Sequence, residues 1–404
     1  MTIKTTMRRT AEVLREQGIS GVRRKAVGKA FERWGERAED LHLLPDDVAD
    51  SRLTPRAWPG TGAETGRPLT IGWIFSGLAE GSGGHTTAFR MVEALEAAGH
   101  RCVLYVYDGV GGSAERYRGL VRSWWPNVKA EIRDYADGLS GCDGYVATAW
   151  QTAHVLACRG DMPGARLYLA QDYEPYFYPR GAAYEFAADS YRFGFTTITI
   201  GRMVADELRA NHDVTATVAP FGCDTSAYRV DSPERRSGVV FYAKPGIARR
   251  GFELAVLGLR ALHSARPDIP IHTFGIKPGS LPFPAEVHAH MRPADLNLLY
   301  NGCSAGLALS FTNISLIATE LLAAGVVPVV NDHAGSRADL DNRYVEWVRP
   351  TPAALAEGII AAHERHRSVG PRTVSESVRG VSWQPAADAF VRAVEDACGE
   401  RGVR

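Results

Sequence analysis

The sequence predicts an α/β fold made of two doubly wound domains, each with a mainly parallel sheet. The length of 404 residues suits two domains of ordinary size. Strand and helix patterns alternate from residue 69 to about residue 223 and again from residue 238. The stretch 311–330 adds a polar turn, a short helix, a stop at Gly325 and an apolar strand, which is the repeating unit of such a fold.

The composition indicates a globular protein. Hydrophobic residues make up 45% and charged residues 23% of the chain, and the formal net charge is zero. A zero balance argues against a nucleic-acid binder that relies on a global basic field. We expect no membrane span and no signal peptide, because no apolar run approaches ~20 residues and the N-terminus lacks an apolar core. Six cysteines without CxxC spacing predict reduced thiols and a cytoplasmic protein: Cys102, Cys142, Cys158, Cys223, Cys303 and Cys398.

Residues 1–66 are predicted to form a helical N-terminal extension and a linker. Apolar residues recur at helical spacing, and the polar face is basic. Two interpretations remain open. The extension is either a peripheral contact with anionic lipid at the inner face of the plasma membrane or an appendage packed on the body. The linker follows from Pro45, Pro55, Pro59 and the glycines from Gly60 to Gly66.

The first Rossmann-like domain is expected over residues 67–229. It opens with a strand at 69–75, a glycine-rich turn at 76–85, a helix at 86–98 and a strand at 101–107. Glycines between a strand and a helix let the backbone approach a phosphate, so the turn is a candidate phosphate contact. The alternative is an ordinary turn without a ligand, because the glycines do not follow the GxGxxG spacing of a dinucleotide site.

The second Rossmann-like domain is expected over residues 230–380. Strands are predicted at 238–243, 270–274 and 304–310, and helices at 251–265 and 294–300. Residues 381–404 are predicted to form a C-terminal helix that crosses back to the first domain, with Pro385 in its first turn.

Two cations at a strand end predict a diphosphate clamp in the second domain. Lys244 follows the strand 238–243, and Arg250 precedes the next helix. The alternative is surface charge on a loop. Glu320 lies among apolar residues on the short helix after the polar turn, and the N-terminus of that helix would present backbone N–H groups to an anion.

The segment Gln171-Asp-Tyr-Glu-Pro-Tyr-Phe-Tyr combines carboxylates with aromatic rings after a strand of the first domain. Sugars offer hydroxyls and an apolar face, so this loop is a candidate carbohydrate site; the alternative is a loop packed by its own tyrosines. His85 and His154 are the histidines nearest the predicted cleft, and a lone histidine more often packs than catalyses. We expect no cofactor and no metal, since HExxH, zinc-type spacing and a strong DxD motif are absent.

Taken together, these motifs resemble the GT-B glycosyltransferases, especially the retaining family called GT4, over residues 70 to about 395. Lys244 and Arg250-Gly251 match the spacing of two basic residues in that family, although arginine is usual at the first position. Glu320 matches the second glutamate of its Glu-x7-Glu signature, and Thr312 stands in place of the first. Ala219-Pro-Phe-Gly-Cys-Asp resembles the interdomain turn of the family.

The resemblance implies a nucleotide-sugar donor, a retaining transfer and a role for each matching residue. The second glutamate of the family binds the nucleotide ribose, and the first binds the donor hexose, so Thr312 implies a different sugar. The residues implied in donor binding are Gly83, Gly84, His85, Lys244, Arg250, Thr312, Asn313, Ile314, Ser315 and Glu320. Those implied in acceptor binding are Gln171, Asp172, Glu174 and Tyr176, and those implied in catalysis are Lys244, Arg250 and Asp172.

The loop that begins at Gln171 is similar to a Gln-Asp-aromatic-Glu-Pro loop in rhamnosyltransferases of cell-surface glycan assembly. This resemblance favours dTDP-L-rhamnose as donor and a glycan or lipid-linked acceptor. Two other classes stay open. One is a non-catalytic nucleotide-sugar binding protein with a degenerate GT-B fold, and the other is a GT-B epimerase or phosphorylase.

Overall fold

The computed structural model describes residues 42–55, 57–58, 60–64, 66–107, 114–232, 236–276, 281–289 and 291–399. The chain divides into two compact units. The first unit comprises Met1–Ile198, Leu208–Thr217 and Ala387–Arg404, and the second comprises Thr199–Glu207 and Val218–Ala386. The helices predicted within residues 1–41 lie outside the described residues, and the part of the extension that follows contains a 3-10 turn, η1 (Pro45–Asp47).

The first unit is built on a seven-stranded sheet of order β3-β2-β1-β4-β5-β6-β7. The register is parallel wherever β1 pairs with β2 and β4, β2 with β3, and β4 with β5. The strands are β1 (Thr70–Phe75), β2 (Arg101–Val106), β3 (Glu131–Asp134), β4 (Gly144–Ala147), β5 (Ala165–Ala170), β6 (Thr196–Ile200) and β7 (Thr217–Ala219).

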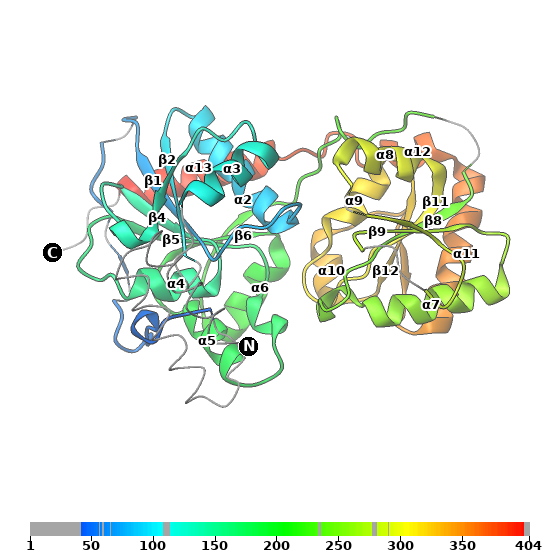
Figure 1. Ribbon diagram of the computed structural model, residues 1–404, viewed down its shortest axis with the longest axis horizontal. Helices are drawn as coiled ribbons and strands as arrows, with labels where there is room; N and C mark the ends of the chain where they lie inside the picture. Colours follow the sequence, from blue (N-terminus) through cyan, green and yellow to red (C-terminus); the bar gives the residue numbers. More distant parts are fainter. Residues whose placement is uncertain are drawn as a thin grey trace, which may run out of the picture. The chain divides into compact units, whose positions relative to one another are not determined.

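Helices cover both faces of this sheet (Figure 1), so its central strands are buried on both sides. On one face Trp73 of β1 stacks on Phe390 at 5.3 Å between ring centroids, and Phe75 stacks on Phe89 at 5.1 Å. The helices and short turns are α2 (Gly83–Ala97), α3 (Ala114–Trp124), η2 (Tyr135–Asp137), α4 (Trp150–Ala157), η3 (Glu174–Phe177), α5 (Ala182–Ser190), α6 (Arg202–His212) and α13 (Gln384–Gly399).

The second unit is built on a six-stranded parallel sheet of order β10-β9-β8-β11-β12-β13. The strands are β8 (Gly238–Tyr242), β9 (Ile271–Phe274), β10 (Glu286–His288), β11 (Cys303–Leu307), β12 (Val327–Asn331) and β13 (Glu346–Val348). The helices and one 3-10 turn are η4 (Ala248–Arg250), α7 (Phe252–Ala265), α8 (Pro293–Gly302), α9 (Leu316–Ala323), α10 (Ala334–Asp339), α11 (Pro352–Val369) and α12 (Pro371–Glu376).

Helices α7 and α11 pack closely together in the second unit, because a glycine lies at the contact. A Cβ atom built at Gly258 of α7 would lie 2.9 Å from Cβ of Leu355 in α11. Helices α8 and α9 contact the same sheet at β8, β11 and β12. No helix of the described residues is long and apolar enough to cross a membrane.

The predicted α/β fold with two doubly wound sheets is confirmed, with three local differences. Helix α2 begins three residues earlier than predicted, at Gly83, because Ser82 Oγ accepts a hydrogen bond from the backbone N–H of His85. Strand β11 ends at Leu307 rather than at residue 310. Helix α7 begins at Phe252 rather than at residue 251, because Gly251 adopts a left-handed conformation with φ 60°, and Arg250 ends the turn η4 before it.

Each sheet has a point where the strand order reverses. It lies between β1 and β4 in the first unit and between β8 and β11 in the second. In open α/β sheets, ligands bind outside the carboxyl ends of the strands at this switch point. The loops after these four strands are therefore the first places to look for a site.

Candidate functional site

Lys244 lies just beyond the carboxyl end of β8, at the switch point of the second unit. Its Nζ is 5.3 Å from the ring centroid of Tyr242, within the range of a cation–π interaction. The Tyr242 ring stacks in turn on Phe274 at 4.8 Å. This stacking gives the half-buried Lys244 side chain a fixed support at the edge of the sheet.

The turn that carries Arg250 is bonded to the loop after β11. The backbone N–H of Phe311 donates to the carbonyl of Arg249 at 3.0 Å. A Cβ atom at Gly251 would lie 2.8 Å from Cε2 of Phe311, so the close approach of the two segments requires glycine there. Two loops from opposite sides of the switch point are thereby held together.

Ser310 connects Arg250 to the sheet. Arg250 Nη1 donates to Ser310 Oγ at 2.8 Å, and that hydroxyl donates to the carbonyl of Asn313. The backbone N–H of Ser310 donates to Asn331 Oδ1 at 2.8 Å, and Asn331 Nδ2 donates back to the Ser310 carbonyl at 2.7 Å. Both side chains are buried. Sequence reasoning missed Ser310 and Asn331, although each is a polar residue at or just beyond the end of an apolar strand.

The loop residues predicted to bind the donor are themselves buried. Thr312 is 1% and Ile314 3% exposed, and Asn313 and Ser315 are nearly as buried. Ser315 is the N-cap residue of α9, with extended backbone, and its side chain makes no capping hydrogen bond within the described structure. The helix N-terminus is thus left to other partners, and backbone N–H groups are what this loop can offer an anion.

Glu320 is half-buried on α9 and lies near Tyr300. Burial raises the pKa of Tyr300 well above its usual range, and the negative charge of Glu320 raises this pKa further. The Tyr300 hydroxyl is buried and has no hydrogen-bond partner among the residues that the structure describes. The charge of Glu320 therefore acts on a buried hydroxyl of the second unit.

The predicted phosphate turn of the first unit is the start of a helix. Gly83 and Gly84 are the first residues of α2 and are exposed. A Cβ atom at Gly83 would meet no described atom within 4 Å, so packing in this unit does not demand glycine there. A Cβ atom at Gly84 would lie 3.7 Å from Gln171 Oε1, which brings the glycine turn beside the aromatic loop.

His85 supports the turn before α2. Its Nδ1 lies 3.2 Å from the backbone nitrogen of Ala79, and its ring packs edge-on against Phe75 and Trp125. Burial lowers the pKa of His85, so the imidazole is neutral at pH 7. Its side chain holds the residues that precede the glycines.

Glu174 has a different role from the predicted acceptor contact. Its Oε1 accepts a hydrogen bond from Tyr168 Oη at 2.7 Å, and its Oε2 accepts one from the backbone N–H of Trp150 at 2.9 Å. Trp150 is the first residue of α4, so the carboxylate serves the helix N-terminus. With 6% of the residue exposed and both oxygens accepting hydrogen bonds, Glu174 supports the loop and the start of α4.

Asp172 and Tyr176 divide the loop into a buried and an exposed part. Asp172 is buried, and its Oδ1 accepts from the backbone N–H of Tyr173 at 2.9 Å. The hydroxyl of Tyr191 donates to the Asp172 carbonyl at 3.2 Å. Tyr176 is 40% exposed and contacts Tyr173 edge-on at 4.7 Å, so its ring offers an apolar surface on this loop.

His154 is a packing histidine. It is fully buried, its Nδ1 accepts from the backbone N–H of Ala49 at 3.1 Å, and its Nε2 lies 3.0 Å from the Phe186 carbonyl. Both ring nitrogens are thus engaged inside the first unit, and no atom is left for a reaction.

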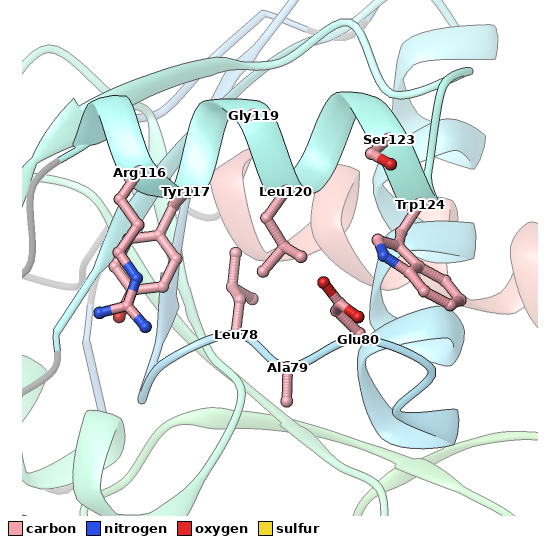
Figure 2. Close-up of a pocket in the computed structure, with 9 residues that line it drawn as sticks. All are labelled: Leu78, Ala79, Glu80, Arg116, Tyr117, Gly119, Leu120, Ser123 and Trp124. Carbon is pink, nitrogen blue, oxygen red and sulfur yellow. The ribbon is translucent and has the colours of Figure 1, made fainter. Parts of the chain in front are cut away.

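A pocket of about 520 Å³ lies between the turn after β1 and helix α3. Figure 2 shows the Glu80 carboxylate directed into the space below α3, near Leu120 and Trp124. The wall combines two charges, two aromatic rings and small residues: Leu78, Ala79, Glu80, Arg116, Tyr117, Gly119, Leu120, Ser123 and Trp124. The sequence did not predict this pocket, because its lining comes from two segments that are distant in the chain.

Comparisons with known proteins bear on both units. Residues 237–360 match the family model described as "WsaF, C-terminal domain". The O-antigen biosynthesis protein RfbC of Myxococcus xanthus is 25% identical over 374 residues, which cover 88% of this chain and 29% of that protein. The chain thus spans less than a third of the curated relative.

Two solved glycosyltransferases share the fold. HepE of Anabaena, solved with UDP and glucose, has a TM-score of 0.62 and 11% identity, with 81% of this chain and 100% of that one covered. WaaG, a glycosyltransferase involved in lipopolysaccharide biosynthesis, has a TM-score of 0.59 and 11% identity, with 80% and 99% covered. The predicted resemblance is therefore confirmed at the level of the fold: the chain has the GT-B glycosyltransferase fold, and its residues 237–360 are similar to the WsaF C-terminal domain.

Proposed function

We propose that this protein is a glycosyltransferase that moves a sugar from a nucleotide-sugar to a glycan or lipid-linked acceptor. One observation carries the proposal. Lys244, Arg250 and the N-terminus of α9 gather at the carboxyl ends of β8 and β11, at the switch point of the second sheet. Two cations and a set of backbone N–H groups at such a point form a site for a diphosphate.

The proposed chemistry of the second unit is electrostatic. As the bond between sugar and phosphate breaks, negative charge grows on the departing diphosphate. Lys244 and Arg250 stabilise that charge. Because the two side chains are already in place, the site does not have to reorganise during the reaction. The bond from Arg250 to Ser310 supports this role, because it holds the guanidinium in place before the ligand arrives. Glu320 is proposed to bind the nucleotide ribose.

The proposed donor is dTDP-L-rhamnose. The support is the threonine at position 312, where a hexose-binding glutamate would stand in the resembling family, together with the Gln171–Pro175 loop. The relative RfbC is named for O-antigen biosynthesis, a process that assembles cell-surface glycan. HepE was solved with UDP and glucose, so the base and sugar of this chain need their own test.

In the first unit, we propose that the acceptor meets Tyr176 and Gln171. The exposed ring suits the apolar face of a sugar, and the Gln171 amide suits its hydroxyls. Asp172 lies beside them at the carboxyl end of β5, and its proposed catalytic role rests on that position. The transfer is proposed to retain configuration, with the leaving phosphate taking the acceptor proton and no metal in the step.

The test is nucleotide release from a panel of dTDP-, UDP- and GDP-sugars, with a lipid-linked glycan extract as acceptor. We expect one donor to be selected, and we expect Lys244→Ala and Arg250→Ala to lose most of the turnover. Arg260→Ala, an exposed change on α7 in the same unit, serves as the matched control.

Other outcomes separate the competing classes. Nucleotide binding without turnover would favour the non-catalytic binding protein. Conversion of the nucleotide-sugar without any acceptor would favour an epimerase. Near-normal turnover in both alanine variants would remove the proposed clamp.

A further inference from the structure

Three metal-ligating side chains meet at the edge of the sheet in the second unit. His272 lies on β9, and Glu286 and His288 lie on the edge strand β10. The two strands are parallel, with Glu286 beside His272 and His288 beside Phe274. Residues two apart on a strand share a face, so this register puts the three side chains on one side of the sheet.

The ligand atoms are close enough to share one ion. Oε2 of Glu286 lies 3.2 Å from Nδ1 of His272, and Oε1 lies 3.5 Å from Nε2 of His288. All three groups have ligand atoms within 4.8 Å of one another. Tetrahedral Zn²⁺ with bonds of 2.0–2.1 Å requires about 3.3 Å between neighbouring ligand atoms, which is close to both distances.

The two histidine nitrogens that face Glu286 are buried and have no partner in good hydrogen-bond geometry within the described residues. Nδ1 of His272 and Nε2 of His288 lie within ion-pair distance of the carboxylate, and neither has a hydrogen-bond partner among the described residues. Buried polar atoms normally have a partner, so such a pair calls for an explanation. A cation between the nitrogens and the carboxylate would supply a partner to each of them.

The histidine rings are held in position. A Cβ atom at Gly238 of β8 would lie 2.9 Å from Cδ2 and 3.0 Å from Nε2 of His272, so the ring occupies space that glycine leaves. The His272 and His288 rings stack at 5.9 Å with 21° between their planes. Glu286 is the exposed member, with 65% of its side chain accessible, and it leaves one side of the cluster open to water.

We propose that His272, Glu286 and His288 bind a Zn²⁺ ion, with solvent as the fourth ligand. Two imidazoles and one carboxylate suit zinc and related first-row transition metals better than Mg²⁺ or Ca²⁺, which prefer oxygen ligands. The ion would tie the three-residue edge strand β10 to β9.

This site is separate from the proposed diphosphate clamp. Glu286 pairs with His272, which pairs with Val240, four residues before Lys244. Strand spacing alone puts the cluster about 15 Å from Lys244. The proposed zinc site is therefore independent of the transfer reaction, and evidence against zinc binding would leave the proposed function unchanged.

The experiment uses the full chain without a histidine tag, treated with a chelator and then dialysed. Isothermal titration with ZnCl₂ is expected to show one equivalent bound, with a melting temperature raised by a few degrees. MgCl₂ at the same concentration is expected to give neither effect.

Variants locate the ion. Losing a residue that only hydrogen-bonds to a metal ligand weakens metal binding about 10–100-fold. Losing a ligand itself, as in His272→Ala or His288→Ala, is therefore expected to weaken zinc binding about a hundredfold or more. Glu286→Gln is the fallback if the histidine variants fail to fold, because Glu286 is exposed and its change should leave the fold intact. This variant is expected to weaken zinc binding about tenfold. His263→Ala on α7 is the matched control and should bind as the parent does.

Two results would overturn the proposal. The first is the absence of one-equivalent zinc binding by the parent chain, which would leave the cluster as a His–Glu–His ion-pair network. The second is unchanged affinity in both His272→Ala and Glu286→Gln, which would put the bound zinc elsewhere.

Discussion

The carboxyl edges of the two sheets use charge in opposite ways. In the second unit, Lys244 and Arg250 remain partly accessible; buried Ser310 and Asn331 support Arg250, and the Tyr242 ring supports Lys244. In the first unit, the carboxylates of Asp172 and Glu174 are themselves buried and support the loop, and an aromatic ring is what remains exposed. The cations at the end of β8 therefore form a candidate ligand surface, whereas the Glu174 carboxylate near the end of β5 accepts hydrogen bonds from its own unit.

The physical reason lies in the side chains. Lysine and arginine have long apolar stems that can pack while the charge stays accessible. Aspartate and glutamate are short acceptors, and a helix N-terminus with unpaired N–H groups lies close to them on the same edge. Glu174 accepts hydrogen bonds from the first residue of α4 and from Tyr168 of β5, both in its own unit.

The largest expected effect is on turnover in the second unit. Lys244→Ala and Arg250→Ala are each expected to lower kcat by roughly 10²–10³, because each removes a preorganised stabiliser of the leaving diphosphate. Initial rates of nucleotide release measure this. The melting temperatures of both variants, followed by circular dichroism, should match that of the parent within a few degrees. If kcat falls less than tenfold in both variants, Lys244 and Arg250 do not form the proposed clamp.

Glu174→Ala is expected to act on stability instead. It leaves the Trp150 N–H and the Tyr168 hydroxyl without their acceptor, which costs about 3 kcal/mol. Urea unfolding measures the loss. Arg122→Ala, an exposed change on α3 in the same unit, should be near neutral by the same measurement. A stable Glu174→Ala variant with impaired acceptor binding would restore the predicted acceptor contact.

Asn331→Ala tests the support behind the cations. It removes both hydrogen bonds to the backbone of Ser310 and is expected to cost about 2 kcal/mol in stability. The Michaelis constant for the donor should also rise, since the loop that orients Arg250 loosens. An unchanged Michaelis constant would separate Ser310 from the proposed donor site.

The pH dependence of stability should contain a contribution from His366 on α11. Burial, followed by the charge of Arg236, lowers the pKa of His366 from 6.5 to about 4. The folded state therefore resists protonation, and this contribution is fully present above pH 6.5 and is lost as the pH falls toward 4. As the pH falls from 6.5 to 4, the melting temperature of His366→Gln should fall less than that of the parent. An equal fall in both proteins would show that other groups cause the pH dependence.

The smallest expected effect is at Tyr176. Tyr176→Ala removes an exposed ring and should change the free energy of unfolding by less than about 1 kcal/mol. The Michaelis constant for the acceptor should rise several-fold while that for the donor stays the same. A change in the donor constant alone would move Tyr176 out of the acceptor site.

The sequence predicted the sheets and their strand ends well, because buried parallel strands are continuous apolar runs bounded by turns. It placed Lys244 and Arg250 at the edge of the second sheet for the same reason. It could not assign the partner of Glu174, since that depends on where α4 begins in space. It also missed His272, Glu286 and His288, because strand pairing assembles that cluster and the chain spacing does not resemble a metal motif.

The most direct test of the central claim is thermal stabilisation by dTDP, UDP, GDP, ADP and dTDP-L-rhamnose, measured on the parent, Arg250→Ala and Arg260→Ala. A nucleotide at a hundred times its dissociation constant adds about 2.7 kcal/mol, which raises the melting temperature by a few degrees. The proposal predicts that nucleotides of one base selectively raise the melting temperature of the parent. Arg260→Ala should show the same rise, and Arg250→Ala should not. No shift with any nucleotide, or an equal shift in Arg250→Ala, would contradict it.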